Sequence, residues 1–325
     1  MEQTKINHSP LITAIESFVE DTITRQRPWD NYWYELVELL QELQVQYNQD
    51  LMYSAYNAAM INFMLELEKN ETEFQYIRKS TLQSFSFRDV QLRFKKFKKK
   101  HEDEVNKFKE DELNNRIKAL EYTELLLEHY SKLEIIRVDF AYKCDKRTRI
   151  DISDFRENIR KLLDRMQDKD KHFKNLHGYI YALEQGSEKG YHAHFIFFFD
   201  GSRVQADRYI ADCIIDSWKE ITNYEGIGFN CNTKINRDSF KATGNDALGR
   251  VNRNDFVKRD NILKVVRYFT EPTKTEQYLR IRCKNMQSFG HGKFNTESRR
   301  GANKTLERVQ YRYSDQGIKY NEDMY

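Results

Sequence analysis

Residues 178–200 read Gly178-Tyr-Ile-Tyr-Ala-Leu-Glu184-Gln-Gly186-Ser-Glu-Lys-Gly190-Tyr-His192-Ala-His194-Phe-Ile-Phe-Phe-Phe-Asp200. Two runs rich in aromatic and β-branched residues flank a loop bounded by glycines, a pattern typical of a β-hairpin. With 186–190 as the loop, Glu184 lies opposite His192, and His194 shares its face because side chains alternate along a strand. Two imidazoles and one carboxylate with open positions form a catalytic divalent-metal site.

The alternative interpretation is that this hairpin has no metal-binding role. His-x-His pairs occur by chance, and a polar strand face is often simply solvated. The pairing register decides between the two, because a slip of one residue would move Glu184 to the other face. The same register predicts Gln185 opposite Tyr191 and a small residue, Ala182, beside His194.

The composition limits the class of protein. The chain has 325 residues, room for one large domain or two ordinary ones, with 39% hydrophobic and 32% charged residues. No run approaches the ~20 apolar residues that span a bilayer, and the first residues do not resemble a signal peptide. We therefore expect a soluble cytoplasmic protein without a membrane partner. The cysteines lack a Cys-x-x-Cys pair and are expected to be reduced, neither zinc ligands nor disulfides: Cys144, Cys213, Cys231 and Cys283.

The charge is unevenly distributed along the chain. The net charge is +3, but residues 1–130 hold 17 basic and 23 acidic residues. Residues 231–325 hold 20 basic and 11 acidic residues, an excess of +9. Such asymmetry indicates either a half that binds a polyanion or an uneven solvated surface.

The hydrophobic pattern divides the chain near residue 130. Residues 10–130 carry apolar residues at helical spacing and predict a helical N-terminal region, 1–130. Beyond it, residues 131–325 show the order strand, helix, two strands, helix, strand, helix, which predicts an α+β domain with a mostly antiparallel sheet flanked by helices. The predicted elements are strand 133–142, helix 151–166, the hairpin, helix 205–220, strand 229–235 and helix 255–266.

A basic cluster with interleaved phenylalanines, 93–100, lies in a helical stretch that could start at Ser86. It is either a nucleic-acid arm or the exposed face of a long antiparallel helical hairpin. The second interpretation places Phe94 and Phe97 against a partner helix, and the acidic run at 102–104 favours it.

The last predicted helix carries a candidate nucleophile. Asp260-Asn261 is a possible cap for a helix over 262–270, whose apolar face leaves Tyr268 beside Lys264 and Arg267. After Pro272 the helix restarts, and Lys274 and Tyr278 are neighbours at i, i+4.

A phenol has a pKa near 10 and needs nearby cations to act as a nucleophile at neutral pH. The chain has 20 tyrosines, most of which are expected to be packing residues. The nucleophile stays open between Tyr268 and Tyr278. On the first predicted strand, Arg137 and Asp139 share a face, and we expect Arg137, Lys264 and Arg267 to contact DNA.

These motifs together resemble the HUH-type replication-initiation endonucleases. More closely, residues 135–290 are similar to the inovirus gene-2-type replication protein family, also called the YagK/YfjJ C-terminal domain. The matching pieces are Ile136-Arg-Val-Asp139, Gly178-Tyr-Ile-Tyr-Ala-Leu-Glu184, Gly190-Tyr-His-Ala-His194, Asp200-Gly201, Trp218-Lys-Glu-Ile-Thr222, Gly249-Arg-Val, Tyr268, Lys274-Thr-Glu-Gln-Tyr278 and Phe289-Gly290. Two departures occur: five residues separate Tyr268 from Lys274 where the family motif resembles Tyr-x-x-Lys, and Gln287-Ser288 stands where Arg-Thr is expected.

The resemblance implies a metal-dependent enzyme that nicks and joins DNA to start rolling-circle replication of a phage, satellite or plasmid. Mg²⁺ or Mn²⁺ would lie on Glu184, His192 and His194. Tyr268 would form a 5′-phosphotyrosine, and Lys274 would stabilise the developing charge.

Its partners would be single-stranded or supercoiled origin DNA and a host helicase, since the chain has no Walker A motif. The alternatives are a relaxase- or transposase-like enzyme and a non-catalytic nucleic-acid-binding regulator.

Overall fold

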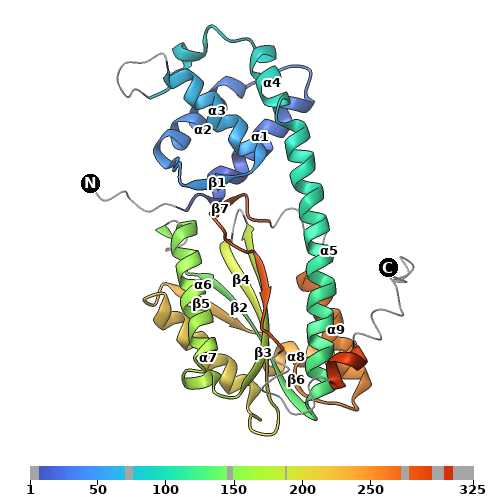
Figure 1. Ribbon diagram of the computed structural model, residues 1–325. Helices are drawn as coiled ribbons and strands as arrows, with labels where there is room; N and C mark the ends of the chain where they lie inside the picture. The colour runs from blue at the N-terminus through green and yellow to red at the C-terminus, as the bar shows by residue number, and fades with distance from the viewer. Residues whose placement is uncertain are drawn as a thin grey trace.

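The structure is a computed structural model that describes residues 7–69, 76–144, 149–186, 189–271, 278–294 and 304–309. Figure 1 shows a helical part at the top and a sheet-containing part below it, joined by the long helix α5. The expected α+β architecture is confirmed. No helix among these described residues is long and apolar enough to cross a lipid bilayer.

The upper part is a cluster of helices around its own apolar core. Its elements are α1 (Ser9–Thr24), α2 (Tyr32–Gln46), the short strand β1 (Leu51–Tyr53), α3 (Ala55–Glu68), the 3₁₀ turn η1 (Lys79–Leu82) and α4 (Phe87–Lys95). Ser86 caps α4: its hydroxyl accepts from the backbone N–H of Asp89, whose carboxylate accepts from the N–H of Ser86. Phe94 is fully buried, edge-on to Phe63 of α3, which supports the packing interpretation of the basic cluster.

Helix α5 (Lys98–His129) belongs to both parts of the molecule. At about 1.5 Å per residue, its 32 residues span roughly 48 Å. From Ala119 onward its buried residues pack in the core that covers one face of the sheet. The domain boundary near residue 130 stays a prediction. The apolar side of α5 packs against the sheet from Ala119, before that point.

Within the part of the chain that the structure describes, the sheet has six strands, and their pairings are antiparallel. The order is β5-β2-β4-β3-β8, and β6 pairs with the other end of β2. The strands are β2 (Lys132–Tyr142), β3 (Leu176–Gly186), β4 (Gly190–Asp200), β5 (Gly226–Asn230), β6 (Gly249–Asn252) and β8 (Phe289–His291).

Helices cover both faces of the sheet. On one face, α6 (Ile152–Gln167) and α7 (Asp207–Ile221) bury apolar side chains against β2, β3 and β4. On the other, α5 and α9 (Phe256–Phe269) do the same. Other described elements are the 3₁₀ turn η3 (Lys171–Phe173), α8 (Lys234–Ala242) and β7 (Ile281–Cys283), which pairs with β1 of the helical part.

Two predicted elements have different bounds from those expected. The strand predicted over 229–235 ends at Asn230. Beyond Asn230, the side chain of Asn232 replaces the backbone as the hydrogen-bonding partner of β2. It accepts from the N–H of Arg137 and donates to the carbonyl of Ile135, and the chain then turns away into α8.

The cap predicted at Asp260-Asn261 is wrong. Helix α9 begins at Phe256, because the Asp255 carboxylate accepts from the N–H of Lys258. Asn261 is buried inside the helix and donates to the carbonyl of Gly244.

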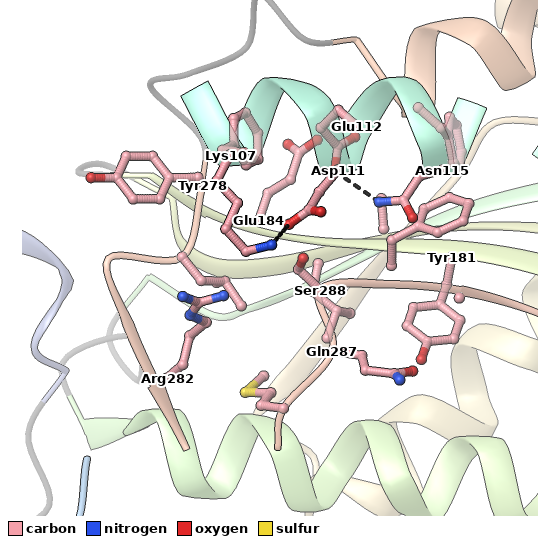
Figure 2. A pocket seen from close by; sticks show the side chains of 18 of the residues that line it. Lys107, Asp111, Glu112, Asn115, Tyr181, Glu184, Tyr278, Arg282, Gln287 and Ser288 are labelled. Carbon is pink, nitrogen blue, oxygen red and sulfur yellow. Dashed lines mark hydrogen bonds and ion pairs between the residues drawn. The ribbon is translucent and has the colours of Figure 1, made fainter. Parts of the chain in front are cut away.

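A cavity of about 930 Å³ lies between α5, the end of β3 and residues 278–291 (Figure 2). Its walls include Glu184 and Tyr278, two of the candidate site residues. Basic and acidic side chains alternate around it; Lys107 of α5, for example, pairs with Asp111 at 3.5 Å. This cavity gives solvent and ligands one approach to the carboxylate of the predicted site.

Candidate metal centre

The hairpin has the register that the sequence predicts. Glu184 pairs with His192, Gln185 with Tyr191 and Ala182 with His194, and β3 and β4 pair without a bulge over this stretch. The three candidate ligands therefore share one face of the sheet. This is the polar end of the face that α5 and α9 cover further along.

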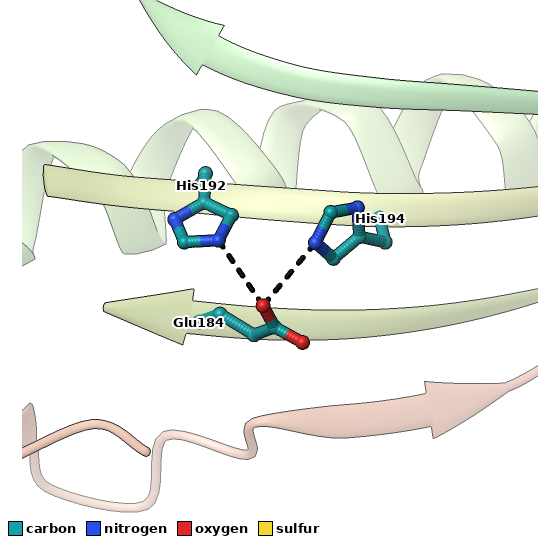
Figure 3. Close-up of side chains that lie close together, drawn as sticks. All are labelled: Glu184, His192 and His194. Atoms are coloured by element: carbon teal, nitrogen blue, oxygen red, sulfur yellow. Dashed lines mark hydrogen bonds and ion pairs between the residues drawn. The ribbon is translucent and has the colours of Figure 1, made fainter. Parts of the chain in front are cut away.

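The side chains converge on one point (Figure 3). Oε2 of Glu184 lies 3.1 Å from Nε2 of His192 and 3.2 Å from Nε2 of His194. One ligand atom from each residue lies within 4.8 Å of the others, and among the described residues this is the group of His, Cys, Asp and Glu with such a geometry. Glu184 and His192 are buried, and His194 is half-buried.

The other ring nitrogen of each histidine faces an oxygen atom. Nδ1 of His192 lies 3.1 Å from the carbonyl oxygen of Gly190, and Nδ1 of His194 lies 2.8 Å from Oδ1 of Asp139. The carbonyl of Gly190 favours a proton on Nδ1 of His192. The Asp139 carboxylate, which is at ion-pair distance but not in hydrogen-bond geometry, attracts a proton to Nδ1 of His194. Both Nε2 lone pairs then face Glu184. Two lone pairs and a carboxylate oxygen at this distance repel one another unless a proton or a cation lies between them. The donor set therefore fits a divalent metal.

Asp139 is itself held by Arg137, whose Nε and Nη2 lie 3.1 Å from the two carboxylate oxygens. Burial on its own raises the pKa of Asp139, but the contacts with His194 and Arg137 outweigh it and lower this pKa to about 2. Burial likewise lowers the pKa of His194, and the contacts with Asp139 and Glu184 outweigh it and raise this pKa above its usual value. Sequence reasoning placed Arg137 and Asp139 on one face but missed that Asp139 supports a ligand.

The C-terminal end of α9 lies next to this centre. The ring of Phe269 is 5.9 Å from that of His194, and the Arg137 guanidinium lies 5.0 Å from the same Phe269 ring. Tyr268, the preceding residue, is 55% exposed. Burial lowers the pKa of Arg137, but the Asp139 carboxylate and, with smaller effects, Cys231 and Tyr268 raise it.

The second candidate, Tyr278, has a different environment. It is largely buried, its hydroxyl donates to Oε2 of Glu16 at 2.7 Å, and the Arg280 guanidinium lies 4.7 Å from its ring. Figure 2 shows this hydroxyl pointing away from Glu184. Burial raises the pKa of Tyr278, and the Glu16 carboxylate raises it further, so the phenolate is strongly disfavoured.

The remaining predicted site residues are cationic. Lys264 is exposed on α9, and Arg267 on the same helix is half-buried. Lys274 lies outside the described residues. Arg137, predicted as a DNA contact, is mainly engaged with Asp139 and Phe269 in the structure.

The comparison with known families matches the part of the sequence that forms this centre to one domain. The sequence profile of the YagK/YfjJ C-terminal domain matches residues 92–292. The chain belongs to this family. The YagK/YfjJ C-terminal domain, as matched, spans α5, the whole sheet, the three candidate ligands and both candidate tyrosines. No curated protein and no solved structure matches the chain.

Proposed function

We propose that the chain is a metal-dependent, HUH-type DNA nicking and joining endonuclease that starts rolling-circle replication of a phage, satellite or plasmid in the cytoplasm. The observation that carries this proposal is the convergence of the Glu184 carboxylate and the two histidine Nε2 atoms on one point of a sheet face. Tyr268, which is exposed and directly precedes Phe269 at His194, would supply a hydroxyl for covalent chemistry. Glu184, His192 and His194 would hold Mg²⁺ or Mn²⁺, which when bound polarises a phosphate oxygen.

The chain's own residues would carry the covalent step. The Tyr268 oxygen forms a bond to the phosphorus, the bond from phosphorus to the 3′ oxygen breaks, and the tyrosine proton passes to solvent while the 3′ oxygen gains one. The 3′-OH primes synthesis. Joining is the reverse step: a free 3′-OH attacks the phosphotyrosine, the bond from phosphorus to the tyrosine oxygen breaks, and that oxygen regains a proton. Arg137, Lys264 and Arg267 provide cations near the phosphate, and the basic C-terminal part holds the DNA.

Two contrasts support Tyr268 over Tyr278 as the nucleophile. Tyr268 is exposed and directly precedes Phe269, whose ring lies against His194, whereas Tyr278 donates its hydroxyl to a carboxylate and is turned away from Glu184. Burial and the Glu16 carboxylate oppose the phenolate of Tyr278.

The test is incubation with a library of single-stranded origin DNA and Mn²⁺, followed by mass spectrometry of any DNA-linked peptide. We expect an adduct on the peptide containing Tyr268, lost when EDTA removes the metal. Nicking of supercoiled plasmid under the same conditions separates the enzyme from a non-catalytic nucleic-acid-binding regulator. The sequence of the linked DNA separates an origin from the target of a relaxase or transposase.

A further inference from the structure

The helical N-terminal part is joined to the sheet-containing part by backbone pairing. β1 and β7 form a two-stranded antiparallel sheet, with Leu51 opposite Cys283 and Tyr53 opposite Ile281. The N–H of Ser54 then donates to the carbonyl of Arg280 at 2.8 Å. The segment that follows Tyr278 is thus held by a strand from the other end of the chain.

A buried ion pair lies behind this small sheet. Oε1 of Glu16, on α1, lies 2.8 Å from Nε of Arg280, and its Oε2 accepts from the hydroxyls of Tyr278 at 2.7 Å and of Ser54 at 3.1 Å. Glu16 and Arg280 are only 9% and 7% exposed. A buried charge is costly unless its oppositely charged partner is present. The Glu16–Arg280 pair therefore fixes how the helical N-terminal part docks on the sheet-containing part.

A second set of contacts continues from Arg280 to the metal ligand. The N–H of Arg280 donates to Oε1 of Gln185 at 2.8 Å, and Nε2 of Gln185 donates to the hydroxyl of Ser9 at 3.0 Å. Gln185 is fully buried and directly follows Glu184 on β3. Both ends of its amide are satisfied, one from α1 and one from the segment that Glu16 holds.

We infer that the N-terminal helices hold the metal centre in place, with Ser9 and Glu16 as positioning residues for the end of β3 that carries Glu184. Ser9 acts through Gln185, and Glu16 acts through Arg280, which also bonds Gln185. Glu16 also keeps the Tyr278 hydroxyl turned away from that centre, which favours Tyr268 of the two candidate tyrosines. The inference rests on the metal site of the proposed function but not on DNA cleavage. Ligand side chains need positions fixed to about 0.5 Å, which a strand end gains from such buried neighbours.

The experiment compares Ser9→Ala and Glu16→Ala with Glu20→Ala, a matched control that removes an exposed carboxylate from the same helix. Hydrogen exchange reports on residues 181–186, calorimetry gives the affinity for Mn²⁺, and nitration by tetranitromethane reports on Tyr278. We expect faster exchange at the end of β3 and Mn²⁺ affinity about tenfold weaker in both variants. Glu16→Ala also speeds nitration of Tyr278, and Glu20→Ala changes none of these.

The following outcomes decide the inference. Unchanged Mn²⁺ affinity in folded Ser9→Ala and Glu16→Ala would overturn it, because a role in docking alone moves only the exchange rates and the stability. If Glu16→Ala does not fold, Ser9→Ala, which removes a single oxygen atom, decides the question. If the unaltered protein binds no Mn²⁺, the metal site of the proposed function fails and this inference fails with it, and faster exchange at 181–186 in the variants then reports docking alone. If the unaltered protein binds Mn²⁺ but cleaves no DNA, the proposed cleavage fails and the affinities of the variants still decide the inference.

Discussion

Nδ1 of His194 lies 2.8 Å from Oδ1 of Asp139, in the row of the sheet where these two residues pair across β4 and β2. Arg137 holds the same carboxylate from the other side through two nitrogen atoms. The imidazole is therefore oriented through a carboxylate that is itself fixed. In metal sites such partners raise the basicity of the ligand and fix its tautomer.

The first prediction concerns this carboxylate. Asp139→Asn keeps the size of the side chain but removes the charge that orients His194, so we expect the Mn²⁺ affinity to fall about 10- to 100-fold. Isothermal titration calorimetry measures the effect. Asp164→Asn, which removes an exposed carboxylate on α6 paired with Arg160, is the control. Equal affinity in the two variants would show that Asp139 has no part in ligand orientation.

The same residue predicts a pH dependence of the metal-free protein. The pKa of Asp139 is about 2 in the folded chain and near 3.9 when unfolded. A lowered folded pKa contributes stability that is present above the unfolded pKa and is lost as the pH falls through the folded one. Asp139 should thus contribute roughly 2 kcal/mol to the free energy of unfolding at pH 7.

Urea unfolding in EDTA measures this contribution. The difference in unfolding free energy between the unaltered protein and Asp139→Asn should grow as the pH falls from 7 to 5, because Asp139 opposes the effect of burial and raises the pKa of His194, whose proton strengthens the pair. It should shrink from pH 4 towards pH 2, where Asp139 itself gains a proton. A difference that does not shrink below pH 4 contradicts the assignment.

The third prediction concerns the ligands. His192→Ala combined with His194→Ala removes two of the three donors, so Mn²⁺ binding should fall at least about 100-fold and nicking should disappear. Circular dichroism checks that the fold persists. His172→Ala on the 3₁₀ turn η3 is the control, and it should leave metal binding and nicking intact. Nicking by the folded double variant at the original rate would exclude the metal centre from catalysis.

The fourth prediction separates the two tyrosines. Tyr268→Phe removes only the hydroxyl of a residue that is 55% exposed, so it should eliminate the covalent DNA adduct and leave stability and DNA binding nearly unchanged. Tyr278→Phe leaves Glu16 without one of its buried donors, so it should keep the adduct but destabilise the protein by about 1–3 kcal/mol. Adduct formation and urea unfolding give the two readouts. If only Tyr278→Phe abolishes the adduct, the assignments exchange, and if neither does, either tyrosine can act.

The fifth prediction concerns electrostatics. Residues 231–325 carry an excess of +9, so single-stranded DNA binding should weaken steeply as salt rises from 50 to 200 mM. Fluorescence anisotropy with a labelled oligonucleotide measures the slope. Affinity that does not change with salt would refute a role for these charges in holding DNA.

Patterns of neighbouring residues in the sequence were enough to predict the hairpin register, one helix cap and one strand of this protein. The hairpin register followed from two glycines and strict alternation, because a strand that buries one face tolerates no slip. The cap at Ser86 and the strand over 133–142 followed from short-range rules, and the structure confirms them. The cap at Asp260-Asn261 was misplaced because Asp255, five residues earlier, is an equally good cap and lies nearer the start of the helix.

What the sequence determined by itself is therefore the local geometry: the elements, their faces and the three ligands, since each depends on residues a few positions apart. Only the tertiary structure decided which residues surround those ligands. Asp139 reaches His194 across two strands 55 positions apart, and Glu16 reaches Tyr278 and Arg280 from the far end of the chain. Such contacts are set by how strands pair and helices pack, and no periodicity along the chain encodes a partner at that distance.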